Sequence, residues 1–526
     1  MGAPAADVDQ VLVVGAGPTG LLLAAELERR GVGCLLIDAH DAPAGWDRAT
    51  VIHARSLEVF ESLGVVDRFL AAGVRVRGVR FHSNGEVLGE LEHRGSGSRY
   101  GFELGVSEEV TEAVLTEHLE AQGGSVTRST RLVGVAPEAT GVTATVESGG
   151  RRRDVPVAWV VGCDGFHSTT RELAGIGYDG HDIAAPWAVF DCTLEGWDQP
   201  YDVNPAYLDR PSLTLTALPG RRWRAYLRPT SESSDLVAEA TGVLRHYEPG
   251  VSVTDVEHPA RFHCHTKVAR RYRAGRILLA GDAAHVCSPN QGHGMNTGIQ
   301  DAYNLAWKLA LVCDGHAGTA LLDSYEAERR PVAIAVGRSG DEVEESAGLR
   351  DPGARAARDR AIRAVYADPR SAQHEAVAGA ELDVSYAGSP IVSGDGNGHL
   401  GPGERLPETE PVRLRNGDVC RLHELARRPG HTVLVLGRAG HGERVAATAG
   451  DVHAAVDRSP VADAVVALSG DDDAPDPVGN LGPAVTDQLG IETITILLIR
   501  PDRFVGFRSD HADVPALSGA LSALLR

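Results

Sequence analysis

The segment Gln10–His40, QVLVVGAGPTGLLLAAELERRGVGCLLIDAH, carries the strongest local signal in the chain. A short apolar run leads into Gly15, Gly17 and Gly20, helix-spaced apolar residues follow, and a second apolar run ends at Asp38. In such a strand–turn–helix unit the first glycine permits a tight turn. The second lets a pyrophosphate approach the backbone, and the third lets the helix pack on the sheet. Asp38 follows Gly20 by 18 residues, where a carboxylate can accept hydrogen bonds from a ribose. The segment therefore predicts a dinucleotide site.

Two later segments also place an aspartate at the end of an apolar strand. VAWVVGCDGFHSTTRELAGIG contains Asp164, and GRILLAGDAAHVCSPNQGHGMNTGIQDAYNLAWKLA contains Asp282, followed by a glycine-rich loop and a helix expected from about Met295 to Leu311. Such an aspartate, facing a helix start, can hold ribose or ribityl hydroxyls. The partial positive charge of a helix start can also stabilise an electron-rich ring. We expect all three segments to converge on one dinucleotide.

Together, GAGPTG, CDG with Ser168 and Arg171, and AGDAAH with GMNTGIQDAYNLAWKLA resemble the three fingerprints of group A flavoprotein aromatic hydroxylases. The resemblance is closer to the bacterial aromatic polyketide hydroxylase branch, and to phenol hydroxylase at the C-terminal end. It runs from about Gln10 to Ala347 and resumes from about residue 398. It implies an α/β fold: a Rossmann-type FAD-binding domain with an inserted antiparallel-sheet substrate domain, as in p-hydroxybenzoate hydroxylase, and a thioredoxin-like C-terminal domain.

The resemblance implies the following domain assignment. Residues 1–73, 93–180 and 270–395 are assigned to the FAD-binding domain, 74–92 and 181–269 to the substrate sheet, and 398–526 to the thioredoxin-like domain. Asn84-Gly85 predicts a hairpin between strands at 74–82 and 87–92. Further strands are expected at 187–194, 213–218 and 223–228.

The resemblance implies cofactor contacts from several parts of the chain. Asp282 would bind the FAD ribityl chain, Asp164 would serve the pyrophosphate side and the use of NAD(P)H, and Arg48 matches the family's arginine after the second strand. The full implied set is Gly15, Gly17, Pro18, Thr19, Gly20, Asp38, Arg48, Glu108, Leu132, Asp164, Gly165, Asp282, Pro289, Gly294, Met295 and Asn296.

Three positions depart from the family pattern. Asp38 stands where the family usually has Glu, with a shorter reach. Glu108 stands in place of a Gln that commonly touches the flavin chain, and a carboxylate accepts hydrogen bonds but cannot donate them. The usual Pro-x-Gly-Gly-Gln-Gly loop reads Pro289-Asn-Gln-Gly-His-Gly294, which puts the side chains of Gln291 and His293 beside the expected flavin.

The implied activity is that of an FAD-dependent monooxygenase that consumes NADPH (or NADH) and hydroxylates a polycyclic aromatic polyketide through a flavin C4a-hydroperoxide. The flavin would do the chemistry, so no catalytic side chain is assigned, and the loop from Pro289 to Gly294 is expected at its reactive edge. Only one complete GxGxxG segment exists, so the nicotinamide is expected to bind transiently. The alternatives are Baeyer–Villiger oxygen insertion on the same scaffold, and a flavin- and ligand-binding protein without turnover. A simple NAD dehydrogenase is a third option.

The candidate substrate contacts lie on one predicted strand, and one further segment contains residue types that bind metals. In the strand at 223–228, Trp223 shares an apolar face with Ala225 and Leu227, while Tyr226 lies on the other face. Both aromatic residues are candidate substrate contacts, although Trp223 fits an ordinary core position equally well. Phe262-His-Cys-His265 suggests a metal site, but neighbours on a strand alternate in direction, so no metal is expected.

The composition bounds the partners. With 51 Lys and Arg against 72 Asp and Glu, the formal net charge is −21, which disfavours nucleic acid and anionic membranes. Seven scattered cysteines without a CxxC pair are typical of a reduced, cytoplasmic protein, and no signal peptide or membrane span is expected. A small aromatic substrate and O2 are the expected partners, with a homodimer as a possible assembly.

Overall fold

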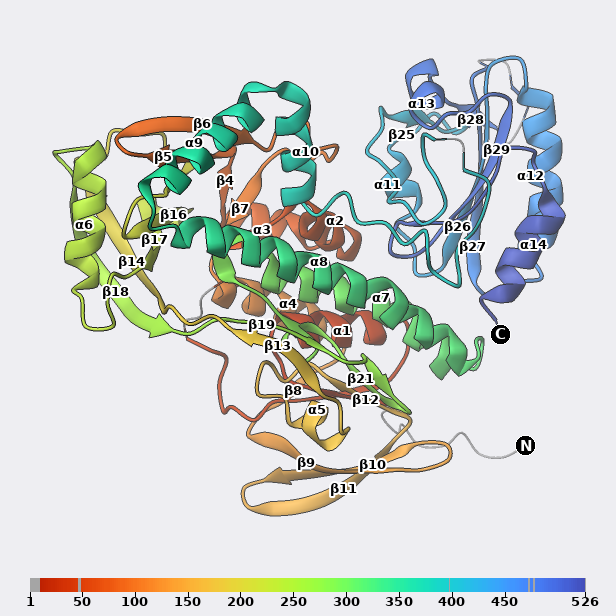
Figure 1. The fold of residues 1–526 in the computed structure, drawn as a ribbon. Helices are drawn as coiled ribbons and strands as arrows, with labels where there is room; N and C mark the ends of the chain where they lie inside the picture. The colour runs from red at the N-terminus through yellow and green to blue at the C-terminus, as the bar shows by residue number, and fades with distance from the viewer. Residues whose placement is uncertain (1–9, 46–48, 397, 472–473, 476–477, 526) are drawn as a thin grey trace. The chain divides into compact units, whose positions relative to one another are not determined.

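The computed structural model describes residues 10–45, 49–396, 398–471, 474–475 and 478–525 (Figure 1). The chain divides into two compact units. The first comprises residues up to Glu28, Gly33–Ala302 and Val332–Leu382; the second comprises Arg29–Val32, Tyr303–Pro331 and Asp383–Arg526. Residues 303–331, which the sequence analysis assigned to the FAD-binding domain, thus group with the C-terminal unit. The chain is an α/β protein with several mixed sheets.

A six-stranded sheet lies at the centre of the first unit, and the strands of its core are parallel. Its order is β20 (Arg273–Ala274), β21 (Ile277–Leu279), β12 (Trp159–Gly162), β1 (Val11–Val14), β2 (Cys34–Ile37) and β8 (Val126–Thr127), with β20 antiparallel to its neighbour. Val14 pairs with Gly162 on one side and with Ile37 on the other, and Gly162 pairs with Leu279. The strands therefore end together, and the residues that follow them meet along one edge.

Apolar side chains bury one face of this sheet under a second, antiparallel sheet of β9 (Thr130–Pro137), β10 (Val142–Ser148) and β11 (Arg151–Val157). Leu12 and Val14 of β1 share one buried cluster with residues 142, 144 and 146 of β10, which alternate along that strand as Val, Ala and Val. Helix α1 (Pro18–Arg29) buries its apolar residues between Leu21 and Leu27. This packing holds in place the sheet edge at which β1, β12 and β21 end and the three motifs begin.

The first unit also contains a separate seven-stranded sheet. Its order is β18 (Ser252–Phe262), β14 (Trp187–Glu195), β17 (Arg222–Arg228), β16 (Ser212–Leu218), β15 (Val203–Tyr207), β5 (Gly78–Ser83) and β6 (Glu86–Glu92). The predicted hairpin is confirmed, with Asn84 and Gly85 at φ of 51° and 78°. The strand expected at 74–82 is broken, however, because Val74–Val76 (β4) pairs with a different sheet. Helix α6 (Leu236–Tyr247) covers one face of the sheet.

The remaining elements of the first unit are shorter and connect these sheets. They are the strands β3 (Val51–Ile52), β7 (Glu103–Gly105), β13 (Tyr178–Asp182), β19 (His265–Ala269) and β22 (His285–Val286), and the helices α2 (Ala54–Leu63), α3 (Val66–Ala72), α4 (Glu108–Ala121), α5 (Thr169–Leu173), α9 (Pro352–Ala367) and α10 (Pro369–Gly379). Two long helices, α7 (His293–Cys313) and α8 (Asp323–Gly348), contain the boundaries between the units.

The second unit is built on an eight-stranded sheet, in the order β23 (Ser393–Gly394), β30 (Val505–Ser509), β29 (Ile494–Ile499), β26 (His431–Gly437), β27 (Ala462–Ser469), β28 (Gly479–Asn480), β24 (Val412–Arg413) and β25 (Val419–Cys420). Its helices are α11 (Leu422–Leu425), α12 (Gly442–Val456), α13 (Pro483–Gln488) and α14 (Val514–Ala523).

Alternation along the central strands of this sheet produces two cores. Val433 and Val435 face the cluster that includes α12 and α14, while Leu434 and Leu436 face a second cluster on the other side. The turn between β29 and β30 holds Arg503 at a φ of 65°, a left-handed conformation that residues with a side chain seldom adopt.

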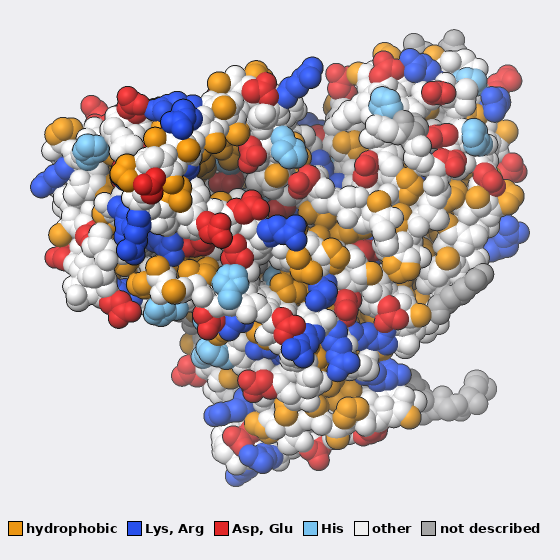
Figure 2. All heavy atoms as spheres, viewed as in Figure 1, with side chains coloured by type: hydrophobic (Ala, Val, Ile, Leu, Met, Phe, Trp, Pro, Cys, Tyr) orange, Lys and Arg blue, Asp and Glu red, His pale blue; other side chains and the backbone are white. Residues whose placement is uncertain are grey.

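Charge is spread over the visible surface. In Figure 2, acidic and basic side chains are interspersed with apolar ones across the visible face. Among the described residues, no helix is both long enough and apolar enough to cross a bilayer.

Candidate functional site

The three glycines of the first motif have distinct local roles. Gly15 has a φ of 102°, and a Cβ there would lie 2.3 Å from the carbonyl oxygen of Cys163. A Cβ on Gly20 would lie 1.9 Å from the carbonyl oxygen of Gly15, so only glycine lets α1 approach the turn. A Cβ on Gly17 meets nothing closer than Glu112 Oε1 at 4.0 Å. The turn is therefore closed on the sheet side and open beside Gly17, which is the geometry that a pyrophosphate requires.

Asp38 braces this turn. Its carboxylate accepts hydrogen bonds from the backbone N–H of Ala16 at 2.7 Å and from that of His40 at 2.8 Å. The carboxylate also lies 2.9 Å from His40 Nδ1, and since a carboxylate has about four acceptor positions, it retains capacity for a ribose hydroxyl. Asp38 links the end of β2 to the glycine turn after β1.

The third motif packs directly on the first. A Cβ on Gly281 would lie 2.7 Å from Thr19 Oγ1, and one on Gly298, in α7, would lie 2.4 Å from the same atom. The side chain of Thr19 therefore fills the space between these two glycines. Beside it, Asp301 accepts from the backbone N–H of Gly281 at 3.1 Å and lies 2.6 Å from His285 Nε2. His285 is buried in this pair, which fits a structural role.

The second motif is tied to the third through Arg171. Its guanidinium donates to the carbonyl oxygen of Ala283 at 3.0 Å and lies over the ring of Tyr178, whose hydroxyl donates to the carbonyl oxygen of Asp282. Asp164 itself accepts from Ser168 Oγ at 2.5 Å and from the N–H and hydroxyl of Thr170, both at 2.9 Å. Ser168 is the N-cap of α5, and Asp164 supports this helix start by accepting from Ser168 and Thr170. Asp282 is exposed at the edge of the sheet.

The glycine-rich loop before α7 is anchored by Glu344 of α8. This carboxylate accepts from Ser288 Oγ at 2.5 Å, from Asn290 Nδ2 at 2.7 Å and from the indole N–H of Trp187 at 2.9 Å. A Cβ on Gly294 would meet no atom within 4 Å, so the start of α7 borders open space. Pro289 and Met295 are half-buried beside it.

Asn296 is committed to holding this loop against the segment before α2. Its Oδ1 accepts from the backbone N–H of His53 at 3.0 Å, and its Nδ2 donates to the carbonyl oxygens of Val51 and Gly292 at 2.9 and 2.8 Å. With 0% of the residue exposed, its side chain is not available to a cofactor, although its backbone lies at the helix start.

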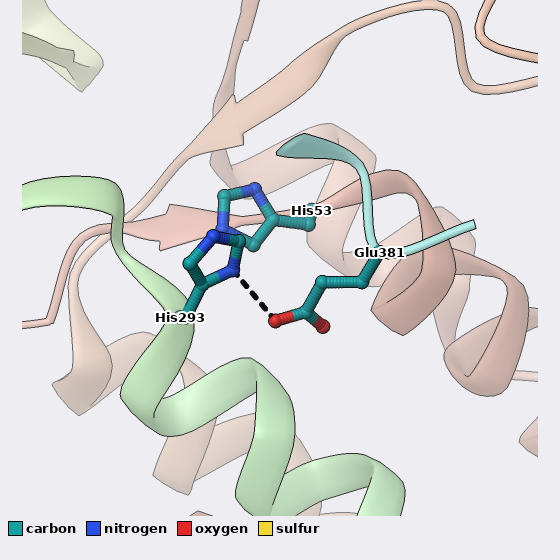
Figure 3. Close-up of side chains that lie close together, drawn as sticks. All are labelled: His53, His293 and Glu381. Carbon is teal, nitrogen blue, oxygen red and sulfur yellow. Dashed lines mark hydrogen bonds and ion pairs between the residues drawn. The ribbon is translucent and has the colours of Figure 1, made fainter. Parts of the chain in front are cut away.

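A buried group of two histidines and two glutamates lies against this loop. His293 Nδ1 is 2.8 Å from Glu381 Oε1, and the rings of His53 and His293 have centroids 5.0 Å apart (Figure 3). His53 is held from the other side by Glu103, at 3.1 Å from Nδ1. Although burial disfavours the charged form, the hydrogen bond and charge of Glu103 raise the pKa of His53.

Burial opposes ionisation of Glu103 as well, but the charge of His93 and the hydrogen bond of His53 hold its pKa well below the usual range. No motif in the sequence indicates this group. His293 stood out there only as a departure from the family loop, while Glu381 follows α10 in no recognisable motif.

The comparisons with known proteins agree with this geometry. The family model described as "FAD binding domain" matches residues 9–339. The chain belongs to this family. It is an FAD-dependent monooxygenase of the aromatic hydroxylase type, and FAD is its cofactor.

Proteins similar to this family member include the 6-methylpretetramide 4-monooxygenase of Streptomyces rimosus, at 33% identity over 99% of the chain and 94% of the relative. The solved structure of the OxyS anhydrotetracycline hydroxylase from Streptomyces rimosus is 29% identical, with a TM-score of 0.77 over 98% of this chain and 99% of that one. CabE, an aromatic hydroxylase from angucycline biosynthesis, is 26% identical, with a TM-score of 0.75 over 99% of each chain.

The residues present in this flavoprotein fit FAD. The turn is open beside Gly17, and Cβ atoms on Gly165 and Gly294 would meet no atom within 4 Å. Asp38 and Asp282 stand at the carboxyl ends of β2 and β21, where hydroxyl groups of a dinucleotide bind in such sheets.

Two other expected cofactor contacts, Glu108 and Leu132, differ in how accessible their side chains are. Glu108 starts α4 and accepts from the backbone N–H of Ala49 at 3.3 Å, so it lies near the site. Leu132 is 2% exposed in the core between the two sheets, which leaves only its backbone for a contact. Arg48 lies outside the described residues.

The two candidate substrate residues lie on opposite faces of β17. Trp223 is 2% exposed in the core beneath α6, where Trp197 and Tyr201 contact its ring. Its position is therefore that of an ordinary core residue. Tyr226 instead lies 2.9 Å, hydroxyl to hydroxyl, from Thr50, next to the segment that leads to His53. Burial raises the pKa of Tyr226.

The polar face of β17 is held by charges on both sides of Tyr226. Arg224 pairs with Asp191 in the neighbouring strand at 2.6 and 2.8 Å. Arg228 lies 2.7 Å from Glu344, the carboxylate that also anchors the loop before α7. This face of the seven-stranded sheet is thereby joined to the glycine-rich loop.

Proposed function

We propose that this FAD-dependent monooxygenase hydroxylates a polycyclic aromatic compound of the polyketide type, with NADPH as the transient reductant. The observation that carries the proposal is the meeting of Gly15, Asp164 and Asp282 along one sheet edge, next to the loop before α7. The named relatives supply the substrate class. One is a 6-methylpretetramide monooxygenase, one an anhydrotetracycline hydroxylase and one a hydroxylase from angucycline biosynthesis.

The cofactor would be held by residues at the carboxyl ends of the parallel strands. Gly15, Gly17 and the first turn of α1 would receive the pyrophosphate, with Pro18, Thr19 and Gly20 shaping that turn. Asp38 would accept from the ribose, and Asp282 from the ribityl chain. When bound, the flavin supplies the redox chemistry and the oxygen transfer, while the protein positions the substrate and excludes water.

The substrate would bind between the Tyr226 face of β17 and the loop from Pro289 to Gly294. Tyr226 packs beside a buried apolar group made of Ile183, Trp187 and Cys264, which offers a flat ring system apolar contact. The Tyr226 hydroxyl supplies a polar contact at the edge of that face. Trp223 has no part in this arrangement.

The finer domain assignment stays a proposal. The strand order β27-β26-β29-β30, with β26 parallel to β27 and antiparallel to β29, supports a thioredoxin-like C-terminal domain. The seven-stranded sheet supports a p-hydroxybenzoate hydroxylase-like substrate domain built from residues 78–92 and 187–262. A homodimer and a cytoplasmic location are proposed on the sequence alone, and sedimentation of the purified protein tests the first.

The test is a screen of purified, yellow protein for NADPH oxidation stimulated by polycyclic phenols. We expect at least one such compound to accelerate NADPH consumption and to yield a product that has gained one oxygen atom. Product NMR then separates a new ring hydroxyl from an oxygen inserted beside a ketone. Bound FAD with no stimulated NADPH consumption across the screen would reject the proposal in favour of a binding protein.

A further inference from the structure

Several buried titratable groups of the first unit have no part in the proposed cofactor contacts. One group borders the loop before α7: His53, His293 and Glu381, which Figure 3 shows together, with Glu103 hydrogen-bonded to His53. We propose that His293, oriented by Glu381, is the proton acceptor for an ionisable hydroxyl of the substrate. This inference rests on the proposed function, and it names the residue that moves a proton there.

The contact between His293 and Glu381 determines which ring nitrogen of His293 carries the proton. Glu381 Oε1 lies 2.8 Å from Nδ1, and a carboxylate there holds the tautomer that carries its proton on Nδ1. Nε2 then presents a lone pair. Within the described residues, that atom has no hydrogen-bond partner, while 8% of the side chain stays exposed. The arrangement is that of a carboxylate–histidine pair with a free accepting nitrogen.

Glu381 is itself held in place by α7. Its Oε1 also accepts from Thr297 Oγ1 at 3.3 Å, and Gln300 Nε2 donates to its Oε2. Its backbone has a φ of 58°, a conformation that side-chain-bearing residues seldom adopt. Glu381 thus has a strained backbone conformation, and its carboxylate, in a residue that is 5% exposed, points at the first residues of α7.

The neighbouring His53, unlike His293, has no ring nitrogen free to accept a proton. Its Nδ1 faces Glu103 at 3.1 Å, and its Nε2 faces the carbonyl oxygen of Gln291 at 3.1 Å. Since both ring nitrogens point at acceptors, both donate, and the ring is an imidazolium. This agrees with the raised pKa of His53. His53 therefore has no nitrogen left to accept a proton, whereas Nε2 of His293 keeps its lone pair.

A metal site is the competing interpretation of two histidines and a glutamate whose candidate ligand atoms lie within 4.8 Å of one another. A metal ligand needs a deprotonated nitrogen directed at the ion. His53 offers none, because both of its nitrogens already donate. The contacts therefore favour a proton site over a metal site.

The location suits a substrate proton. His293 is the first residue of α7 and follows the loop that Glu344 anchors, and Glu344 also pairs with Arg228 on the Tyr226 face of β17. Gly294, the next residue, borders open space. The titratable groups around His293 are His53, Glu103, His93 and Glu381, and Cys287 precedes the loop. Burial raises the pKa of the Cys287 thiol to about 12, so that thiol remains neutral.

The step is a simple proton transfer. The O–H bond of a phenolic hydroxyl breaks, its proton forms an N–H bond at Nε2, and the electron pair stays on the oxygen. The positive charge on His293 is then balanced by Glu381, and the phenolate is the more electron-rich ring for oxygen transfer. Return of the proton to water restores the neutral ring. General base catalysis of this kind typically contributes about 10²- to 10⁴-fold in rate.

The test compares wild type with His293→Gln and Glu381→Gln, using the compound that stimulates wild-type NADPH oxidation. At neutral pH we expect His293→Gln to lower product formation by about 10²-fold or more. Its rate should recover as pH rises towards the pKa of the free substrate hydroxyl, because solution ionisation then replaces the missing base. Product formation by Glu381→Gln should lie between that of wild type and that of His293→Gln. Both variants should retain FAD.

His431→Gln, which changes a buried histidine of the second unit, is the matched control and should keep the wild-type pH dependence of product formation at neutral and alkaline pH, above the range in which His431 titrates. Wild-type protein without stimulated oxidation would reject the proposed function itself. An active wild type whose pH profile is unchanged in His293→Gln would reject this inference alone. Stoichiometric zinc or another metal in purified protein, lost in the same variant, would replace it with the metal interpretation.

Discussion

The hydroxyl oxygen of Thr19 lies 2.4 Å from the position that a Cβ on Gly298 would occupy. Thr19 belongs to the first motif and Gly298 to the third, and the two are separated by most of the first unit in sequence. Their contact joins α1 to α7 beside the cofactor edge. The spacing leaves no room for a methyl group on α7 at this point.

Gly298→Ala tests that contact. An alanine inside a helix normally stabilises a protein by about 1 kcal/mol relative to glycine, so a loss of stability would report the clash. We expect a lower melting temperature and a lower FAD content. The double variant Thr19→Ala/Gly298→Ala removes the obstructing hydroxyl and should regain most of the stability. A stabilised single variant with full FAD content would show that the two helices do not meet closely.

A second prediction concerns Asp38, which accepts from the backbone N–H groups of Ala16 and His40. Asp38→Ala leaves those donors without their acceptor, at a cost of about 1–3 kcal/mol for a buried group. We expect destabilisation and weaker FAD binding, measured by thermal unfolding with and without added FAD. Asp38→Glu, which restores the residue usual in the family, is the matched control and should retain most binding. Equal loss in both variants would contradict a role for the carboxylate itself.

Much of the cofactor edge could be predicted from sequence because its rules are local. The positive φ of Gly15, the close approach at Gly20 and the opening at Gly17 each follow from one residue and its neighbours. The convergence of Asp164 and Asp282 followed from placing both at strand ends in one parallel sheet. The Asn84-Gly85 hairpin was predictable for the same reason.

The polar group around His293 could not be predicted in this way. Its members come from β7, the start of α2, the start of α7 and the residue range after α10, and no spacing rule connects these segments. Which face of β17 is covered could not be predicted for a related reason. Trp223 sits on the more apolar face, but α6 covers that face, which only the tertiary packing reveals.

The second unit holds a buried ionic group whose loss should be costly. Arg500 donates to both carboxylate oxygens of Glu328, at 2.7 and 2.8 Å, and Lys308 Nζ donates to Glu328 at 2.7 Å, with all three side chains at most 1% exposed. Removing one partner of such a group leaves uncompensated charge, at a cost of about 3–5 kcal/mol. Glu328→Gln should therefore lower the urea midpoint strongly, whereas Glu443→Gln on the exposed face of α12 should not. A small effect at Glu328 would show that the network is not tightly coupled.

Stability should also fall in mild acid because of His431. Burial lowers its pKa from 6.5 to about 4, while its Nδ1 donates to the carbonyl oxygen of Val461. Below pH 6.5 the unfolded chain binds a proton that the folded chain refuses, so the free energy of unfolding decreases as pH falls towards 4. His431→Asn keeps a donor but does not titrate, and should flatten the slope between these pH values. His511→Asn, at an exposed position, should leave it unchanged, and an equal slope in all three proteins would exclude His431 as the cause.

The two aromatic residues of β17 should separate cleanly into a binding role and a packing role. Tyr226→Phe removes one hydroxyl, 2.9 Å from that of Thr50, and should raise KM for the aromatic substrate or reduce the product formed per NADPH, with little change in melting temperature. Trp223→Ala removes a core side chain that is 2% exposed, which typically costs about 3–5 kcal/mol, and should act on stability. Trp223→Phe is the milder control for packing. If Tyr226→Phe left KM and coupling unchanged while a folded Trp223→Phe altered them, the substrate would have to lie on the opposite face of the sheet, beneath α6.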